Sequence, residues 1–389
     1  MKKKIVILGS TGSIGQSTLE VVKRDKKNFE IILLTANNNY KKIIQQAKEF
    51  KAKNVLIKNN KFFLKVKNSL KKNNTKVFSG DINLKKIIKR KVDYTMSSIV
   101  GLAGLQPTVD AIKISKTVAI ANKETIICAW PILSKIIKKY KTKIVPVDSE
   151  HFSIMELTKN ISDDEVEELI ITASGGPFLN VSRNKFKKIK PSQATKHHNW
   201  KMGKKISVDS ANLMNKVFEV IEAYHLFKFD KSKYKVMIHP QSYVHSIIRF
   251  RNGLTKMILY NADMKIPISN ILCQSKNNPP KNSNINIIKQ FNNISFQEVD
   301  SLKFPSIKLI KKCFTYGFST PIIINAANEI LVDLFLKGKI GFLDIVKTIN
   351  KILKDKDFKK YAKRKPSSLK DIKITDKWAR LKTKTMCVI

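Results

Sequence analysis

The stretch "KIVILGSTGSIGQSTLEVV", residues 4–22, contains the features that decide the fold of the amino-terminal part of the chain. A short β-rich apolar run comes first, and an amphipathic helical pattern comes last. Between them, three glycines have a G-x-x-G-x-x-G spacing: Gly9, Gly12 and Gly15. Such glycines permit a tight turn and let backbone N–H groups approach a pyrophosphate at the start of the following helix. The stretch predicts a dinucleotide site, and the alternative is a plain glycine-rich turn.

The same alternation of strand and helix patterns continues through residues 1–148. Helical patterns with apolar residues at three- and four-residue spacing separate most of the short apolar runs, as in "YKKIIQQAKEF". We expect strands at residues 4–8, 30–36, 54–57, 93–100, 117–121 and 143–147. Such alternation predicts a Rossmann-like domain, with a mostly parallel sheet and helices on both faces.

The remaining chain divides into three parts. Residues 149–273 mix strand and helix patterns, which predicts a central α+β domain. Residues 274–299 are polar, contain Pro279-Pro280 and are expected to be a linker. Residues 300–389 are helical in pattern, with a helix that begins at Thr320-Pro321. The expected fold class is therefore α/β, with a carboxy-terminal helical domain.

The composition is that of a folded protein with an unusual charge. Apolar residues make up 42% and charged residues 27% of the 389 residues, and the formal net charge is +45. Only 7 of the 75 basic residues are Arg, and the Lys residues are spread over every segment. A nucleic-acid-binding protein would be expected to gather its basic residues on one face beside stacking aromatic residues. The sequence shows neither feature, so we expect no nucleic-acid partner.

The cysteines and the apolar runs indicate a cytoplasmic protein. The four cysteines lie far apart without a CxxC pair, which favours a reducing compartment. The apolar run after the first lysines is too short for a signal peptide, and no stretch approaches the length of a membrane span. We therefore expect a cytoplasmic enzyme without a membrane partner.

The segment after the second predicted strand should contact the adenosine ribose of a dinucleotide. It contains Asn37, Asn38 and Asn39. An Asp or Glu at this place favours NAD by bonding the ribose 2′-hydroxyl. None is present, so a 2′-phosphate is tolerated, but no Lys or Arg is present either.

A pair of carboxylates follows the last predicted strand of the first domain. Asp148 and Glu150 flank Ser149 in "KIVPVDSEHF". In an extended chain the two acidic side chains would point to the same side and repel each other unless a cation lay between them. A solvated acidic turn is the alternative interpretation.

Several stretches resemble one enzyme family, 1-deoxy-D-xylulose 5-phosphate reductoisomerase, from Lys4 to beyond Glu329. They are "GSTGSIG", "AIANKET", "PVDSEH", "ITASGGPF", "HHNWKMGKKISVDSANLMNKVFEVIEA", "HPQSYVHS" and "NAANE". The resemblance implies conversion of 1-deoxy-D-xylulose 5-phosphate to 2-C-methyl-D-erythritol 4-phosphate in the non-mevalonate isoprenoid pathway. The implied reaction is a retro-aldol and aldol rearrangement followed by reduction by NADPH. The resemblance also implies a divalent cation (Mg²⁺, Mn²⁺ or Co²⁺), a homodimer, and catalytic and dimerisation roles for residues 149–273.

The resemblance also assigns roles to residues at matching positions. The implied metal ligands, which also count as catalytic, are Asp148, Glu150 and Glu219. The further catalytic residues are Lys123 and His197. The implied substrate contacts are Lys123, Ser149, Glu150, Ser174, His197, Trp200, Ser210, Asn215, Lys216 and Glu219. The cofactor contacts are Thr11, Gly12, Ser13, Ile14, Asn37, Asn38, Asn39, Asn122, Glu124 and Gly203. Among these, Ser174, Ser210, Asn215 and Lys216 would hold the phosphate.

The sequence departs from the family's usual residues at three places, and several of the assigned residues have an alternative interpretation. The triple Asn replaces a segment in which the family usually has Lys, Ser or Arg, and His198 and Val217 also depart from the usual residues. The family has a mobile lid near residues 194–204. Taken alone, Lys123 would be a surface lysine, His197 a structural histidine and Trp200 a core residue, and we assign structural roles to His239 and His245. A dehydrogenase of a simpler aldehyde remains the second enzymatic hypothesis.

Overall fold

The computed structural model describes residues 2–196, 200, 203–273, 292 and 294–387, and it divides into two compact units. Unit 1 comprises residues 2–125, 133–152 and the described part of 263–284. Unit 2 comprises residues 126–132, 153–262 and the described part of 285–389.

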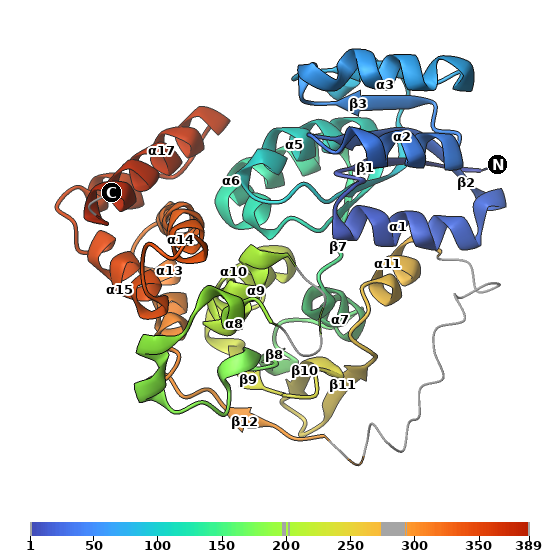
Figure 1. The fold of residues 1–389 in the computed structure, drawn as a ribbon. Coiled ribbons are helices and arrows are strands. Elements are labelled where there is room, and N and C mark those ends of the chain that lie inside the picture. Colours follow the sequence, from blue (N-terminus) through green and yellow to red (C-terminus); the bar gives the residue numbers. More distant parts are fainter. Residues whose placement is uncertain (1, 197–199, 201–202, 274–291, 293, 388–389) are drawn as a thin grey trace. The chain divides into compact units, whose positions relative to one another are not determined.

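Unit 1 is built on a seven-stranded sheet with the order β4-β3-β2-β1-β5-β6-β7, in which every neighbouring pair is parallel (Figure 1). The strands are β1 (Lys3–Leu8), β2 (Phe29–Ala36), β3 (Asn54–Ile57), β4 (Lys76–Ser79), β5 (Val92–Ser97), β6 (Ser115–Ile120) and β7 (Lys143–Pro146). From β1 to β4 each new strand is added on one side of β1, whereas β5, β6 and β7 are added on its other side, so the switch point lies between β1 and β5. In open parallel sheets a ligand binds at this switch point, outside the carboxyl ends of the strands.

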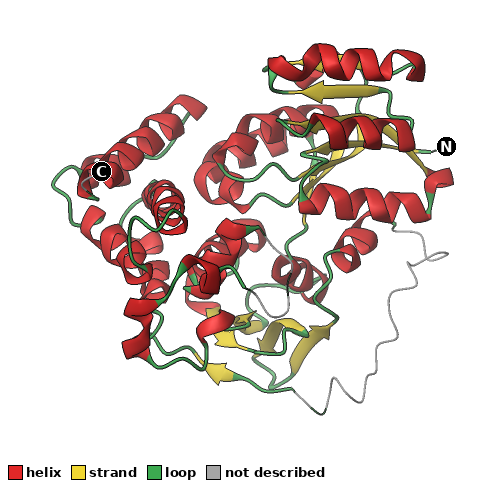
Figure 2. Ribbon diagram, in the orientation of Figure 1, coloured by secondary structure: helices red, strands yellow, loops and turns green. Residues whose placement is uncertain are grey.

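Helices flank this sheet (Figure 2). The helices of unit 1 are α1 (Ser13–Arg24), α2 (Tyr40–Glu49), α3 (Phe63–Leu70), α4 (Leu84–Ile87), α5 (Leu105–Ile114), α6 (Lys123–Tyr140) and α11 (Lys265–Leu272), together with the start of α7 (Ser149–Leu157). The middle turns of α6 and the last turns of α7 belong to unit 2. The central strand β1 is buried from Ile5 to Leu8, as expected for a strand covered on both faces.

Unit 2 contains a five-stranded mixed sheet with the order β11-β10-β8-β9-β12. Only β8 and β9 pair in parallel, while the other pairs are antiparallel. The strands are β8 (Val166–Ala173), β9 (Tyr234–Ile238), β10 (Val244–Phe250), β11 (Thr255–Leu259) and β12 (Gln297–Glu298). Helix α10 (Met214–Phe227) covers this sheet, because Val220 and Ala223 pack with Leu169 and Ile248 in one buried cluster.

The rest of unit 2 is helical. Its helices are α8 (Pro191–Ala194), α9 (Lys204–Ala211), α10 (Met214–Phe227), α13 (Leu309–Thr315), α14 (Thr320–Leu336), α15 (Phe342–Ile352), α16 (Phe358–Ala362) and α17 (Leu369–Met386). Helix α14 begins at Thr320 as predicted, but the capping residue is Ser319, one position earlier. Within the described ranges, no helix combines the length and the apolar character that a membrane crossing requires.

The predicted fold class is confirmed by the parallel sheet of unit 1, the mixed sheet of unit 2 and the helical carboxy-terminal part. The predicted domain borders stay predictions. Most of the predicted linker, residues 274–299, lies outside the described residues, and β12 falls within its last part.

Candidate active site

The glycine turn after β1 has the geometry of a pyrophosphate cradle. Gly9 has a φ of 80°, and Gly12 N–H donates to the Gly9 carbonyl at 3.1 Å. A Cβ atom on Gly15 would lie 2.4 Å from the Gly9 carbonyl oxygen, so a side chain is excluded there. Gly12 caps α1 without a side chain over the helix end. The first N–H groups of α1, from Ser13 and Ile14, therefore face an open concave turn that suits an anion.

The turn is anchored at the switch point. Ser98, directly after β5, donates from its backbone N–H to the Leu8 carbonyl at 3.0 Å and from its hydroxyl at 2.7 Å. Across the other neighbouring strand, Ser10 N–H donates to the Thr35 carbonyl at 2.9 Å. The cradle therefore lies between the carboxyl ends of β2 and β5, where a dinucleotide would cross the sheet.

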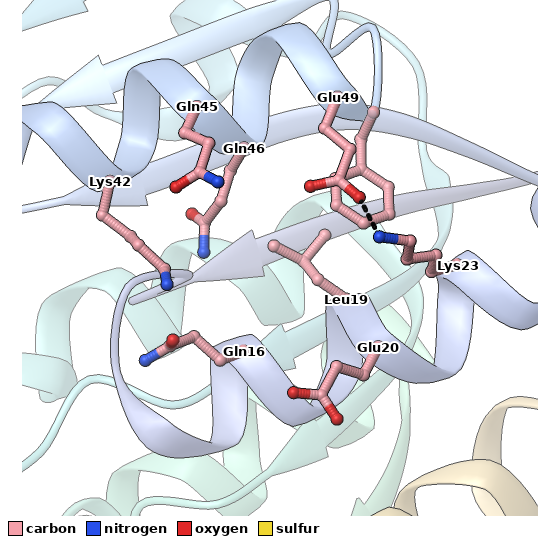
Figure 3. Close-up of a pocket in the computed structure, with 9 residues that line it drawn as sticks. Gln16, Leu19, Glu20, Lys23, Lys42, Gln45, Gln46 and Glu49 are labelled. Carbon is pink, nitrogen blue, oxygen red and sulfur yellow. Dashed lines mark ion pairs between the residues drawn. The ribbon is translucent and has the colours of Figure 1, made fainter.

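A cavity of about 120 Å³ lies beside the turn, between α1 and α2 (Figure 3). Gln46 of α2 contacts the turn next to it, accepting from Ser10 Oγ at 2.8 Å and donating to the Ser10 carbonyl at 2.9 Å. Lys23 and Glu49 form an ion pair of 2.6 Å at its rim. Ligand sites usually enclose about 300–1,000 Å³. The cavity is too small for a dinucleotide, and we assign to Gln46 the task of fixing the glycine turn.

The triple Asn occupies the exposed segment after β2. Asn39 caps α2 by accepting from Lys42 N–H, and Asn38 Oδ1 accepts from Asn59 Nδ2 at 2.9 Å. Asn59 follows β3, the next strand in the sheet. The segment therefore lies at the carboxyl edge of unit 1 on the β2 side of the cradle, where the ribose was predicted.

Asn122 and Lys123 lie at the beginning of α6, after the carboxyl end of β6. Asn122 is buried, and it caps the helix through Oδ1, which accepts from Thr125 N–H at 2.8 Å. Its amide nitrogen donates to the carbonyls of Ile99 and Gly101. These bonds fix the direction of Lys123, the first residue of the helix. Glu124 is buried in the same turn, and the cofactor contacts of Asn122 and Glu124 stay predictions.

Lys123 and Asp148 form an ion pair, with 2.9 Å between Nζ and Oδ2, and both side chains are largely shielded from solvent. His151 Nδ1 lies 3.5 Å from the other Asp148 oxygen. Burial raises the pKa of Asp148, but the charge of Lys123 and the nearby His151 ring outweigh it and hold the pKa well below its ordinary value. The carboxylate is therefore ionised at neutral pH, which is the state that binds a cation.

The strand that leads to Asp148 ends earlier than predicted. Strand β7 ends at Pro146, and α7 begins at Ser149, so Asp148 and Glu150 do not alternate along an extended chain. The polar residues that follow the strand favour a helix start over a longer strand. The Ser149 hydroxyl donates to Glu150, and Phe152 N–H donates to the Asp148 carbonyl at 2.8 Å. The pair of carboxylates thus belongs to the first turn of a helix.

In unit 2, the loop after β8 meets the carboxy-terminal end of α9. Ser174 Oγ accepts from Gly176 N–H at 3.1 Å. Gly176 has a φ of 65°, and a Cβ there would lie 2.9 Å from Ala211 Cα and 3.1 Å from the Ser210 carbonyl. The glycine thus permits a close approach between the Ser174 loop and the chain at Ser210, two of the predicted phosphate contacts.

The other two predicted phosphate contacts lie in the first turn of α10, beside the predicted ligand Glu219. Lys216 Nζ lies 2.6 Å from Glu219 Oε2, and the amide of Asn215 donates to Oε1. Lys216 and Glu219 are buried. Since α10 places residues three and four apart on one face, Asn215, Lys216 and Glu219 form one polar cluster in a largely apolar helix.

Part of the predicted lid is described. The Trp200 ring meets His245 edge to face at 5.9 Å, and His245 stacks on Tyr260 at 4.1 Å. The prediction that His197 closes over the substrate falls outside the described residues, as does the departure at His198. Gly203 caps α9 at an exposed position with open space around it, so no local packing requires a glycine there.

The structure supports structural roles for two histidines. His239 Nε2 accepts from Tyr243 N–H at 3.1 Å, and Nδ1 lies 2.9 Å from the Ser295 carbonyl. Burial lowers the pKa of His239, which fits a neutral ring that fixes the turn after β9. His245 is buried between Trp200 and Tyr260.

Each unit therefore gathers part of the predicted site. The carboxyl edge of the unit 1 sheet carries the glycine turn, the triple Asn, Lys123 and Asp148. Unit 2 gathers Ser174 and Ser210 and, separately, joins Asn215, Lys216 and Glu219.

Sequence reasoning missed the left-handed Leu213 between Ser210 and Asn215, which has a φ of 61°. It also missed the bond between Asp209 and Asn328. No sequence pattern signals either feature, because an αL leucine and a contact over 119 positions both depend on tertiary packing.

Three family models match the chain along nearly its whole length. Residues 5–130 match 1-deoxy-D-xylulose 5-phosphate reductoisomerase, residues 144–227 its C-terminal domain, and residues 259–382 the DXP reductoisomerase C-terminal domain. The chain is 46% identical to 1-deoxy-D-xylulose 5-phosphate reductoisomerase of Pelagibacter ubique over 388 residues, which cover 99% of this chain and 100% of that protein.

Solved structures agree with this match. The reductoisomerase of Zymomonas mobilis in complex with NADPH has a TM-score of 0.90 and 35% identity, and covers 100% of this chain and 99% of that chain. A DOX-P reductoisomerase in complex with NADPH, fosmidomycin and magnesium has a TM-score of 0.92 and 31% identity, and the match covers 99% of this chain and 98% of that chain. The chain therefore belongs to the 1-deoxy-D-xylulose 5-phosphate reductoisomerase family.

Proposed function

We propose that this chain converts 1-deoxy-D-xylulose 5-phosphate to 2-C-methyl-D-erythritol 4-phosphate, with NADPH and a divalent cation, through the residues described above. The observation that carries the proposal is the arrangement of unit 1. Its parallel strands bring the glycine turn after β1, Lys123 after β6 and the ionised Asp148 after β7 to one edge of the sheet. A reductase needs its cofactor and its reacting groups on such a common edge.

The residues of unit 1 fit NADPH. The cradle excludes a Cβ at Gly15, as a close approach to a pyrophosphate requires. The adenosine ribose would lie toward β2 and the triple Asn. The nicotinamide would then extend past β5, toward Lys123 and Asp148, because the sheet continues in the order β1-β5-β6-β7.

The residues also fit a divalent metal ion. Carboxylate oxygens are the ligands that Mg²⁺ and Mn²⁺ prefer. We assign the ion to the three carboxylates that the family resemblance implies, Asp148, Glu150 and Glu219, and the ionised state of Asp148 supports this assignment. When bound, the cation polarises the substrate carbonyl and stabilises enolate charge, while NADPH supplies the reducing equivalent.

Lys123 and the phosphate contacts act on the substrate directly. Lys123 would donate to substrate oxygens and stabilise negative charge that develops there, and its cap, Asn122, holds it in place. Ser149, at the start of α7, would contact the substrate hydroxyl groups. Ser174, Ser210, Asn215 and Lys216 would hold the phosphate, and the binding energy of this remote group would orient the reacting carbons.

We also propose that the enzyme works as a homodimer in the cytoplasm. The family resemblance supports the dimer, and the four cysteines, none of them in a disulfide, fit a reducing compartment. Sedimentation of the purified chain at micromolar concentration tests the dimer, and a species of 44.4 kDa alone would contradict it.

One assay tests the activity and separates it from the second enzymatic hypothesis. We expect NADPH oxidation with 1-deoxy-D-xylulose 5-phosphate that requires Mg²⁺ and stops in EDTA. A dehydrogenase of a simple aldehyde would oxidise NADPH without the cation. Absence of turnover with this substrate, in a folded protein supplied with Mg²⁺, would refute the proposed function.

A further inference from the structure

The chain between Ser210 and Asn215 has an unfavourable backbone conformation. Leu213, which is buried, has a φ of 61° and a ψ of 14°, the left-handed region that a residue with a Cβ atom rarely occupies. Such a conformation persists only where the surrounding structure enforces it, and it is often found at functional sites. Three proposed phosphate contacts lie within three residues of Leu213, namely Ser210, Asn215 and Lys216. We call residues 209–216 the phosphate turn.

Two groups from the carboxy-terminal part of unit 2 hold this turn. The hydroxyl of Ser306 donates to the Asn212 carbonyl. From α14, the Asn328 amide nitrogen donates to Asp209 Oδ1 at 2.7 Å. Lys205 Nζ lies 3.2 Å from the second Asp209 oxygen. The bonds from Ser306 and Asn328 join segments that are far apart in the sequence, whereas Lys205 and Asp209 both lie in α9.

The bond from Asn328 is the more consequential of the two. Asp209 is 2% exposed and Asn328 is fully buried. A buried carboxylate needs donors, because water cannot solvate it. Among the described residues, Asn328 Oδ1 has no hydrogen-bond partner, so the amide makes its contact through the nitrogen that faces Asp209.

We infer that Asn328 is a positioning residue for the substrate phosphate, acting through Asp209 on the phosphate turn. Asp209 directly precedes Ser210, whose carbonyl accepts from Leu213 N–H at 3.2 Å, so a shift of Asp209 moves the start of the left-handed turn. Lys216 N–H in turn donates to the Leu213 carbonyl at 3.1 Å. A shift of Asp209 would therefore reach both ends of the phosphate contact set. This inference rests on the proposed function of Ser210 and Lys216.

The chain offers a matched control on the same helix. Asn325 is equally buried and lies one turn before Asn328, but its amide donates to Glu329 of its own helix at 3.3 Å. Asn325→Ala removes an amide of the same size from α14 without touching Asp209. A rescue is also available. Asn328→Asp places two carboxylates side by side, and the double variant Asp209→Asn with Asn328→Asp restores an amide-to-carboxylate bond with the roles exchanged.

The test uses inorganic phosphate binding and turnover of the full chain, with NADPH affinity as the reference. For Asn328→Ala we expect phosphate affinity to fall about tenfold and KM for the phosphorylated substrate to rise by a similar factor. NADPH affinity should stay unchanged, and kcat should fall less than threefold. Asn328→Asp should bind phosphate more weakly still. Compared with Asn328→Asp, the double variant should regain at least half of the lost phosphate affinity on a logarithmic scale.

Two outcomes would overturn the inference. One is unchanged phosphate affinity in Asn328→Ala, and the other is an equal loss in Asn325→Ala. If Asn328→Ala does not fold, the comparison of Asn328→Asp with the double variant takes its place. A double variant that folds but binds phosphate no better than Asn328→Asp would refute the inference. Phosphate binding does not depend on turnover. A wild type that binds phosphate without converting the substrate would refute the proposed function and leave this test in place.

Discussion

The ammonium group of Lys216 and the carboxylate of Glu219 form a buried ion pair, with 2.6 Å between Nζ and Oε2, one turn apart on α10. The first residue is a proposed phosphate contact and the second a proposed metal ligand. Each therefore stabilises the charge of the other when neither ligand is bound. When phosphate binds Lys216 and a cation binds Glu219, the two charges gain new partners together, so we expect the two ligands to favour each other's binding.

The first prediction concerns Lys216→Ala. It removes a phosphate contact, so KM should rise, and kcat should also fall because phosphate binding orients the reacting carbons. It also leaves the buried Glu219 with one donor fewer, which should lower the free energy of unfolding of the metal-free protein by about 3 kcal/mol. Mg²⁺ should recover part of this loss, since a cation neutralises the carboxylate.

The control is Lys337→Ala at the C-cap of α14, where the ion pair with Asp333 is exposed and worth little. Thermal unfolding with and without Mg²⁺ measures both effects. An equal stabilisation by Mg²⁺ in wild type and Lys216→Ala would contradict the proposed exchange of partners.

The second prediction concerns Asp148→Asn. The change removes a charge that the structure keeps ionised, so Mg²⁺ affinity should fall at least a hundredfold and turnover should be abolished. NADPH binding should persist, because the glycine turn lies on other strands of the sheet. Glu219→Gln should behave likewise. Glu156→Gln, a partly exposed carboxylate on α7 paired with Lys159, should leave both properties unchanged. Near-normal activity of Asp148→Asn in EDTA-treated buffer would show that this group is not a metal ligand.

The sequence predicted the sheet of unit 1 because its signal is local. Glycines at 9, 12 and 15 and the alternation of apolar runs with helical patterns are properties of neighbouring residues. The extended arrangement expected for Asp148 and Glu150 was wrong, because α7 begins at Ser149 and the prediction gave no weight to the preference of Asp and Ser for helix starts. The ion pairs of Lys123 with Asp148, and the contact of Asn328 with Asp209, join residues far apart in the chain. A single sequence carries no signal for such contacts.

The third prediction concerns pH. Burial lowers the pKa of His225 to about 4, and the ring stacks on Trp130 at 5.8 Å. The unfolded chain takes up this proton near pH 6.5, whereas the native state takes it up only near pH 4. The unfolded state thus binds more protons in this window, and the contribution to stability, complete above about pH 7, is lost as the pH falls toward 4. At pH 5 the loss should be about 2 kcal/mol.

His225→Phe keeps the stacking and removes the titration. Between pH 8 and pH 5, we expect the unfolding free energy of wild type to fall by about 2 kcal/mol more than that of His225→Phe. Parallel pH profiles for the two proteins would show that His225 is not neutral in the native state.

The last prediction concerns the preference for NADPH over NADH. Asn38 is exposed at the carboxyl edge of unit 1, and its side-chain oxygen is occupied by the Asn59 amide at 2.9 Å. Its own amide nitrogen is thus directed away from that bond and offers a neutral donor to a 2′-phosphate. Neutral bonds are roughly half as strong as charge-assisted ones, so we expect NADPH to be preferred by a modest and salt-sensitive margin.

Replacing Asn38 by Lys adds a positive charge at this place and should widen the preference by about 1–2 kcal/mol. The gain should shrink as the salt concentration rises, because the site is exposed. Asn74→Lys, at an exposed left-handed turn before β4, adds the same charge to unit 1 away from the predicted ribose and serves as the control. The measurement is kcat/KM for both cofactors at low and high salt. If wild type prefers NADH, or if the two lysine variants change the ratio equally, the segment from Asn37 to Asn39 does not contact the 2′-position, and the adenosine end of the cofactor lies elsewhere.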